Sequence, residues 1–229
     1  MKSYTELLEG VYDPNIFKAF FMAGGPGSGK SYAVQLGIGQ AQKEVKVTAQ
    51  GLKVVNSDDV FEKYLRDAQL NFKMDANQGK QRNVLRTRAK VVTKKKFDNY
   101  VEGRLGMVID GTGKDYGKIT TDASGLKQLG YDVHMIFVNT SLDVALERNQ
   151  KRARTVPESI VIKSWNNVQR NLGKFSQYFR RNFIVVDNND ATEDVLTDVF
   201  KQIKILANKK VTNPIAQMWI RSELEKKRR

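Results

Sequence analysis

The sequence predicts an α/β fold in which a parallel five-stranded sheet carries helices on both faces, together with a basic helical insertion. The first observation is a set of five short apolar runs, at residues 17–23, 52–56, 107–110, 133–138 and 183–186. The second is that segments with helical periodicity separate most of these runs. Strands that alternate with helices form parallel sheets with right-handed crossovers, which place helices on both faces.

The predicted helices of this alternation span residues 29–40, 115–129, 141–152, 157–172 and 192–206. For the fourth helix, Pro157 stands near the start and Gly173 is expected to form the C-cap. The apolar residues of the last two helices recur at helical spacing: Val161, Trp165, Val168 and Leu172 in one, and Val195, Val199, Ile203 and Leu206 in the other.

Composition excludes several classes of site. The 229 residues include no cysteine and one histidine, His134, so disulfides, thiol nucleophiles and a histidine-rich zinc site are not expected. No apolar segment approaches the roughly 20 residues that span a bilayer, and the N-terminus lacks an apolar signal region. We therefore expect a cytoplasmic protein with no membrane partner. The net charge of +14 favours a polyanionic partner such as nucleic acid, although an ordinary basic nucleotide-binding enzyme stays possible.

Two segments do not follow the strand–helix alternation: residues 71–104, which are rich in lysine and arginine, and the tail at 208–229, which ends in a run of bases. Without a Gly/Ser-rich linker beside either segment, residues 1–229 are expected to form a single domain. The spacing predicts a helix over 80–104, with one basic face and one buried apolar face. The basic face carries Arg82, Arg86, Lys90 and Lys94, and the apolar face carries Val84, Val91, Val92, Phe97 and Val101.

The strongest motif is the glycine-rich loop GGPGSGKS at residues 24–31, which follows the first strand and precedes a helix. It matches the Walker A pattern, whose backbone N–H groups and helix N-terminus cradle the phosphates of ATP or GTP. Lys30 is expected to reach the β- and γ-phosphates, and Ser31 to hold Mg²⁺. The expected nucleotide contacts are Gly25, Gly27, Ser28, Gly29, Lys30, Ser31 and Tyr32.

The form of this loop is more typical of kinases than of GTPases or motor ATPases. The sequence has no guanine-recognition N-K-x-D motif and no apolar strand ending in Asp-Glu. The nearest equivalent is Ile109-Asp110-Gly111-Thr112, at the carboxyl end of the third strand, where a doubly wound sheet places its ligands. Asp110 is a candidate Mg²⁺ ligand or, alternatively, a capping residue in a turn. Thr112 is a candidate substrate contact.

A second polar cluster, Asn56-Ser57-Asp58-Asp59, follows the second strand, which we expect beside the strand of the glycine loop. A kinase needs a carboxylate that orients and deprotonates the acceptor hydroxyl. We assign Asp58 to that chemistry, and Asp59 to helix capping or substrate contact.

A third cluster, residues 148–157, places four cations between two predicted helices. Arg148 and Arg152 are four residues apart on one helical face, and planar arginines stabilise the charge of phosphoryl transfer. Both are therefore candidate lid residues, and Arg148 a nucleotide contact as well. The alternative is a solvated basic turn.

Taken together, these motifs resemble the polynucleotide 5′-hydroxyl kinases of bacteriophages and the related zeta-toxin-like kinases. The resemblance rests on GxPGSGKS, on N-x-D-D after the second strand, and on R-N-x-K-R followed by V-P and a helix, over residues 18–187. It implies a P-loop kinase fold, ATP and Mg²⁺, Asp58 as the general base, and Arg148 and Arg152 on the donor phosphates. The chain departs from the family at Ser57, where the motif has arginine, and in its basic insertion.

The interpretation that follows is an ATP-dependent kinase that phosphorylates a hydroxyl on nucleic acid, at a 5′ end or on a modified base. On this hypothesis Arg82 and Arg86 contact the phosphate backbone of the acceptor. One alternative is a zeta-toxin-like kinase of a nucleotide-sugar or nucleoside. The other is a nucleic-acid-binding ATPase, which would need the strong Walker B motif that the sequence lacks.

Overall fold

The structure, a computed structural model, describes residues 10–30, 48, 51–72, 78–151, 155–190 and 193–228. It contains a sheet of five parallel strands in the order β2-β3-β1-β4-β5, which confirms the predicted fold class. The strands are β1 (Lys18–Ala23), β2 (Lys53–Val55), β3 (Met107–Asp110), β4 (Asp132–Asn139) and β5 (Phe183–Asp187). The expectation that the second strand lies beside the first was wrong, because β3 separates β2 from β1.

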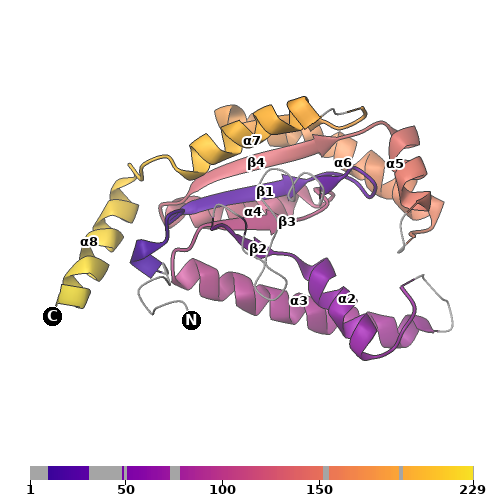
Figure 1. Ribbon diagram of the computed structural model, residues 1–229, viewed down its shortest axis with the longest axis horizontal. Helices are drawn as coiled ribbons and strands as arrows, with labels where there is room; N and C mark the ends of the chain where they lie inside the picture. Colours follow the sequence, from indigo (N-terminus) through magenta and orange to yellow (C-terminus); the bar gives the residue numbers. More distant parts are fainter. Residues whose placement is uncertain are drawn as a thin grey trace.

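The described helices follow the predicted alternation (Figure 1). They are α2 (Ser57–Asp67), α3 (Gly79–Glu102), α4 (Tyr116–Gln128), α5 (Leu142–Gln150), α6 (Glu158–Phe179), α7 (Glu193–Ala207) and α8 (Pro214–Arg228), with short 3₁₀ turns at Gly10–Tyr12 and Arg180–Asn182. Most of the helix predicted at 29–40 lies outside the described residues. None of the described helices is long and apolar enough to cross a membrane.

Each face of the sheet has its own core, because successive side chains of a strand point to opposite faces. In β1, Ala19 and Phe21 belong to one core, and Phe20 and Met22 to the other. The first core is completed by α4, α6 and α8 and by the end of α3, and the second by α7. Burial on both faces explains why the central strands have continuous apolar sequences.

The predicted end of α6 at Gly173 was wrong, since the helix continues to Phe179. Phe175 and Phe179 are buried in the first core and extend the apolar stripe of Val161 and Val168. A Cβ added to Gly173 would meet nothing within 4 Å, so this glycine lies on the open side of the helix. Continued burial therefore outweighs the weak helix propensity of one exposed glycine.

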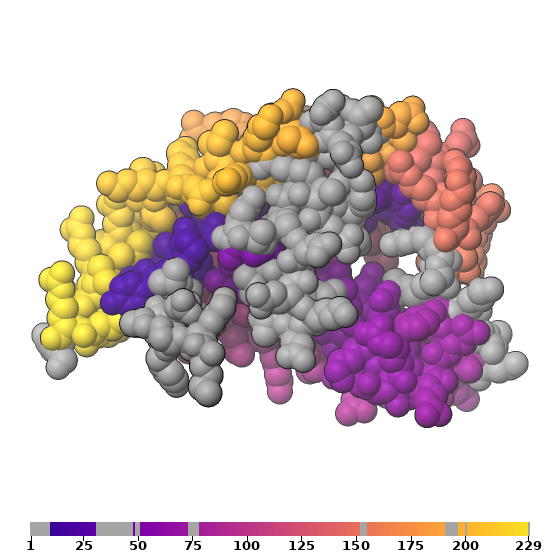
Figure 2. All heavy atoms as spheres, viewed as in Figure 1, coloured from indigo at the N-terminus to yellow at the C-terminus, as the bar shows by residue number. Residues whose placement is uncertain are grey.

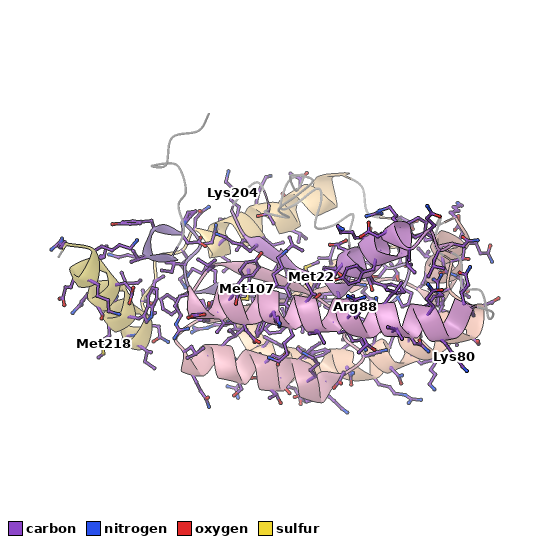
Figure 3. The ribbon with its side chains drawn as sticks, turned by 90° about the horizontal axis from the view of Figure 1, so that it is seen from below. Met22, Lys80, Arg88, Met107, Lys204 and Met218 are labelled. Atoms are coloured by element: carbon purple, nitrogen blue, oxygen red, sulfur yellow. The ribbon has the colours of Figure 1, made fainter. Side chains whose placement is uncertain are left out.

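The insertion supplies α3, which lies below the edge strand β2 in the view of Figure 1 and forms a helical hairpin with α2, which packs on its first half (Figures 1 and 3). A small core of Phe61, Leu65 and Ala89 joins the two helices. The predicted faces of α3 were only partly right: Phe97 and Val101 pack on the first core and Lys90 and Lys94 are exposed, but the first half of the helix differs. Val84 and Val91 are 59% and 53% exposed, whereas Arg82 is only 7% exposed.

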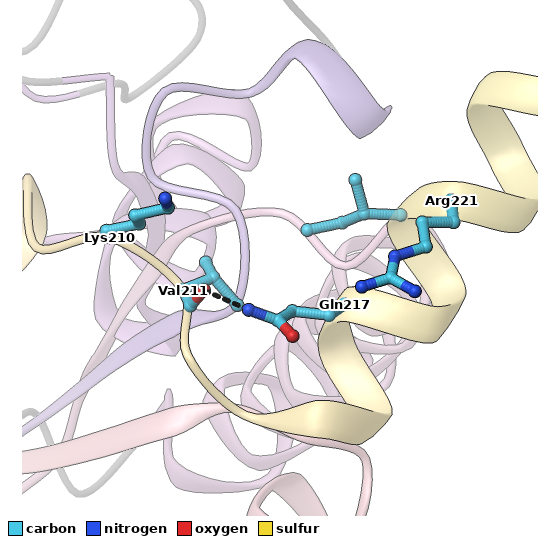
Figure 4. Close-up of a pocket in the computed structure, with 5 residues that line it drawn as sticks. Lys210, Val211, Gln217 and Arg221 are labelled. Carbon is cyan, nitrogen blue, oxygen red and sulfur yellow. Dashed lines mark hydrogen bonds between the residues drawn. The ribbon is translucent and has the colours of Figure 1, made fainter.

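At the amino end of the strands, away from the glycine loop, α8 packs against the first core through Ala216 and Trp219. A pocket opens where the chain turns into this helix (Figure 4). The Gln217 side chain crosses it and donates a hydrogen bond to the carbonyl of Val211, at 3.3 Å. The lining residues are Lys210, Val211, Gln217, Ile220 and Arg221.

Candidate active site

The glycine loop begins at the carboxyl end of β1, in the centre of the sheet. Gly27 and Gly29 have φ angles of +80° and +82°, a region that glycine adopts without strain. A Cβ on Gly27 would lie 2.2 Å from the carbonyl oxygen of Ala145, and one on Gly29 would lie 2.2 Å from Nδ2 of Asn188. The loop is therefore packed so closely between α5 and the segment after β5 that only glycine fits at these two positions.

The polar groups of this loop fit a phosphate ligand. Lys30 Nζ donates to the carbonyl oxygens of Gly24, at 2.6 Å, and Gly25, at 3.2 Å, so the ammonium group is held against the loop. The Ser28 hydroxyl is buried and has no hydrogen-bond partner among the described residues. A buried polar group of this kind is costly unless a ligand or water satisfies it. Ser31 and Tyr32, the other predicted contacts, lie outside the described residues.

Arg148, near the end of α5, lies at the same loop. A Cβ on Gly29 would be 3.8 Å from its Nη1. Its guanidinium donates to the carbonyl oxygens of Asn188, at 2.7 Å, and Asn189, at 3.0 Å. Asn188 in turn donates through Nδ2 to the carbonyl of Ser28, at 2.7 Å. Arg148 thus fastens the segment after β5 to α5, and Asn188 fastens that segment to the glycine loop, roles that sequence reasoning did not anticipate.

A buried asparagine, Asn149, joins the two ends of the predicted lid. Asn149 donates through Nδ2 to the carbonyl of Val156, at 2.8 Å, and accepts from the Val156 N–H, at 3.1 Å. This pair of hydrogen bonds closes the segment between α5 and α6. Arg152 lies outside the described residues, so its lid role stays a prediction. The asparagine in R-N-x-K-R was the available signal for this closure, but no role was assigned to it.

Two side chains of α6 fix the loops at the carboxyl ends of the strands. Trp165 donates through Nε1 to the carbonyl of Thr140, at 2.9 Å, and a Cβ on Gly25 would lie 3.7 Å from its Cα. Asn171 is buried and donates to the carbonyls of Gly113 and Lys114, both at 3.0 Å. Sequence reasoning placed Trp165 among the apolar residues at helical spacing and missed Asn171. The available signal for Asn171 was a polar residue on the buried stripe of the helix.

Asp110 lies beside the glycine loop because β3 pairs with β1, with Met22 opposite Asp110. The Thr112 carbonyl accepts from the Gly24 N–H, at 3.1 Å, so this contact of Thr112 is with the loop itself. Among the described residues, no three acidic or histidine side chains cluster as a metal site. A single carboxylate such as Asp110 nevertheless fits Mg²⁺, which usually takes its other ligands from phosphates and water.

Asn56 connects the end of β2 to Asp110. Its Nδ2 donates to Asp110 Oδ2, at 2.9 Å, and its Oδ1 accepts from the Asp58 N–H, at 2.8 Å. Asn56 is therefore the N-cap of α2, and the expectation that an aspartate caps this helix was wrong. Asp58 and Asp59 both lie in the first turn of α2, where the helix dipole favours negative charge.

The two arginines predicted to contact substrate are instead engaged within the α2–α3 hairpin. Arg82 donates to the carbonyls of Asn71 and Phe72, and its burial contradicts the expected exposed basic face. Arg86 forms an ion pair with Asp58, which it reaches from α3 across the hairpin.

In the space-filling view, α2 and α5 stand at the same end of the molecule, on opposite sides of it (Figure 2). The acceptor candidates and the donor loop therefore both lie at the carboxyl ends of the strands.

Comparison with solved structures shows a shared fold at low identity. A putative kinase from Chloroflexus aurantiacus superposes with a TM-score of 0.52 at 14% identity, over 82% of this chain and 98% of that one. A protein of the PezAT toxin–antitoxin system of Streptococcus pneumoniae gives 0.48 at 16% identity, over 91% and 87%. A chain of the Pnkp1/Rnl/Hen1 RNA repair complex gives 0.49 at 19% identity, over 69% of this chain but only 46% of that one.

A search of curated proteins found no significant match. The zeta toxin family model, however, matches residues 11–199, which include the glycine loop, Asp58, Asp110 and the predicted lid. This match spans well over half of the 229 residues. The resemblance to the zeta-toxin-like kinases is thereby confirmed, and the chain belongs to the zeta toxin family of P-loop kinases, which are ATP-dependent phosphotransferases.

Proposed function

We propose that this kinase transfers the γ-phosphate of ATP to a hydroxyl group of a small nucleotide-like acceptor, such as a nucleotide-sugar or a nucleoside. The family match supports a small acceptor over the nucleic acid that the charge favours. The observation that carries the assignment is the Asn56 bridge, which links the Asp58 N–H to the Asp110 carboxylate. Through this bridge the first turn of α2, which carries Asp58 and follows the edge strand β2, is tied to the carboxyl end of β3 beside β1.

The roles follow from these positions. Lys30 and the loop amides hold the donor phosphates, and Ser31 and Asp110 are the residues that would hold Mg²⁺, which would neutralise phosphate charge when bound. Asp58 accepts the proton of the acceptor hydroxyl as its oxygen attacks the γ-phosphorus, and ADP leaves. Arg148 and Arg152 lie on the donor side of this arrangement.

Labelled ATP tests the proposal directly. The protein is incubated with γ-labelled ATP and, separately, with nucleotide-sugars, nucleosides and oligonucleotides, and the labelled product is identified. The Asp58→Asn variant should bind ATP like the parent but transfer phosphate about 10²- to 10⁴-fold more slowly, the usual scale for a positioned base. Near-parental turnover of this variant would remove Asp58 from the mechanism.

A nucleic-acid acceptor is the second candidate, favoured by the net charge of +14 and by exposed cations on α3. Lys90, Lys94 and Lys95 are all exposed, on the helix that carries Arg86. Each phosphate contact on a single strand contributes a slope of roughly −0.7 to the dependence of log affinity on log salt. If these lysines bind oligonucleotide, replacing all three by Gln should flatten the slope by about 2.

The matched control for that variant replaces Lys201, Lys204 and Lys209, which are exposed on α7 and just after it. These residues belong to another helix, so their loss should leave any slope that is due to α3 unchanged. Label in oligonucleotide, together with a flattened slope for the α3 variant alone, would favour nucleic acid. Label in a small molecule, with equal slopes for all three proteins, would support the small acceptor.

A further inference from the structure

The ion pair between Arg86 and Asp58 differs from the other ion pairs on these helices. Lys63–Asp67 and Lys94–Asp98 are pairs four residues apart on a single helix, with every side chain more than half exposed. Arg86 instead reaches from α3 to α2, and the side chains of Arg86 and Asp58 are 36% and 44% exposed. Exposed pairs of the first kind contribute little, because solvent screens them and both side chains lose freedom.

The position of Arg86 is fixed by packing. Its guanidinium carbon lies 5.0 Å from the ring centroid of Phe61, a buried residue of α2. Arg82, one turn earlier on α3, lies 5.9 Å from the same ring and binds the carbonyls of residues 71 and 72. The small core of Phe61, Leu65 and Ala89 lies beneath both arginines. A planar guanidinium held over an aromatic ring keeps its direction, which a lysine at the same place would not.

We propose that Arg86 is a positioning residue for phosphoryl transfer, which acts by orienting the carboxylate of Asp58 toward the acceptor. The inference rests on the proposed function, in which Asp58 is the base. A carboxylate has two oxygens and about four acceptor positions, so Asp58 can bind Arg86 and an acceptor hydroxyl at the same time. The N–H bond to Asn56 fixes the backbone of Asp58, and Arg86 fixes the side chain.

The chemical step assigns no proton or bond to Arg86. The acceptor hydroxyl gives its proton to Asp58 while its oxygen bonds to the γ-phosphorus, and the bond between that phosphorus and the β–γ bridging oxygen breaks. The arginine keeps its charge throughout, because its side chain does not deprotonate in proteins. The basic insertion thus contributes to catalysis by holding α2 and its first-turn carboxylate.

The test compares Arg86→Gln and Arg86→Lys with a matched control, Arg88→Gln. Arg88 is an exposed residue of the same helix and lies over Tyr64 of α2, 5.9 Å from its ring centroid (Figure 3). For Arg86→Gln we expect kcat to fall about 10- to 100-fold, the scale of an ångström-sized misplacement, with an unchanged KM for ATP. Arg86→Lys should lie between this variant and the parent, and Arg88→Gln should match the parent.

Combining the changes separates positioning from a general loss of structure. In an Asp58→Asn background, Arg86→Gln should cause no further loss, because Arg86 acts only through that carboxylate. An additional loss of the same size would overturn the inference, as would parental kcat for a folded Arg86→Gln. If that variant does not fold, Arg86→Lys decides: parental kcat refutes positioning, and a several-fold fall with unchanged KM for ATP supports it.

The same variants of Asp58 and Arg86 distinguish failure of the inference from failure of the proposed function. Parental turnover of Asp58→Asn refutes Asp58 as the base, and the positioning role of Arg86 fails with it. Impaired Asp58→Asn with parental Arg86→Gln refutes only the role of Arg86.

Discussion

Replacing Gly27 by alanine tests the packing of the phosphate-binding loop against α5. The φ angle of +80° costs an L-residue about 1–2 kcal/mol. The added Cβ would also lie 2.2 Å from the carbonyl oxygen of Ala145 and 2.9 Å from its Cα. These are backbone atoms, which cannot rotate away, so the overpacking adds about 1–3 kcal/mol. The free energy of unfolding should therefore fall by about 2–5 kcal/mol, or the thermal midpoint by roughly 4–20 °C.

Gly25→Ala is the matched control in the same loop. The nearest atom to its Cβ is Cα of Trp165 at 3.7 Å, an ordinary contact, and its φ angle is not in the left-handed region. This variant should stay within about 0.5 kcal/mol of the parent. Scanning calorimetry without nucleotide measures all three proteins under the same conditions. Equal midpoints for the two variants would refute the close packing of Gly27 on α5.

Three other substitutions test separate parts of the molecule. Lys30→Ala removes the ammonium group at the mouth of the loop and should weaken ATP binding and phosphate transfer together, measured by titration and labelled transfer. Arg148→Lys should lower turnover more than it raises the KM for ATP; if Arg148 only anchors residues 188–189, the thermal midpoint will fall and turnover will not. His134→Phe removes an imidazole whose burial lowers its pKa to about 4, assisted by the Lys18 ammonium and opposed by Asp132. In the unfolded chain this histidine has a pKa near 6.5, so below that pH the unfolded state binds a proton that the folded state does not. Between pH 7 and pH 5 the free energy of unfolding of the parent, measured in urea, should therefore fall by about 2 kcal/mol more than that of the variant.

The sequence predicted the strands well because their apolar runs reflect burial on two faces. Ala19, Phe20, Phe21 and Met22 all pack into one core or the other, so no polar residue interrupts the run. The glycine loop could also be predicted from the sequence, because Gly27 and Gly29 adopt positive φ angles that other residues adopt only with strain. Such features depend on a residue and its immediate neighbours along the chain.

The errors at Arg82, Arg86 and β2 concern contacts between distant segments. Arg82 and Arg86 recur at helical spacing, which indicates that they share a face but not whether that face is exposed. The structure packs this face on α2, because carbonyls of residues 71 and 72, the ring of Phe61 and the carboxylate of Asp58 satisfy the two guanidinium groups. The order of the strands in the sheet cannot be predicted from the local sequence either. β2 is an edge strand and not the neighbour of β1.

That edge position explains why the acceptor side needs its own support. The proposed base, Asp58, follows β2, which β3 separates from the strand of the glycine loop, and the Asn56 side chain ties the end of β2 to Asp110 at the end of β3. The Asp58 side chain is held in addition by Arg86 of the insertion. The donor side is fixed independently, by the hydrogen bonds of Arg148 and Asn188. Since no residue of α3 takes part in those donor contacts, changes at Arg86 should alter transfer while the affinity for ATP stays the same.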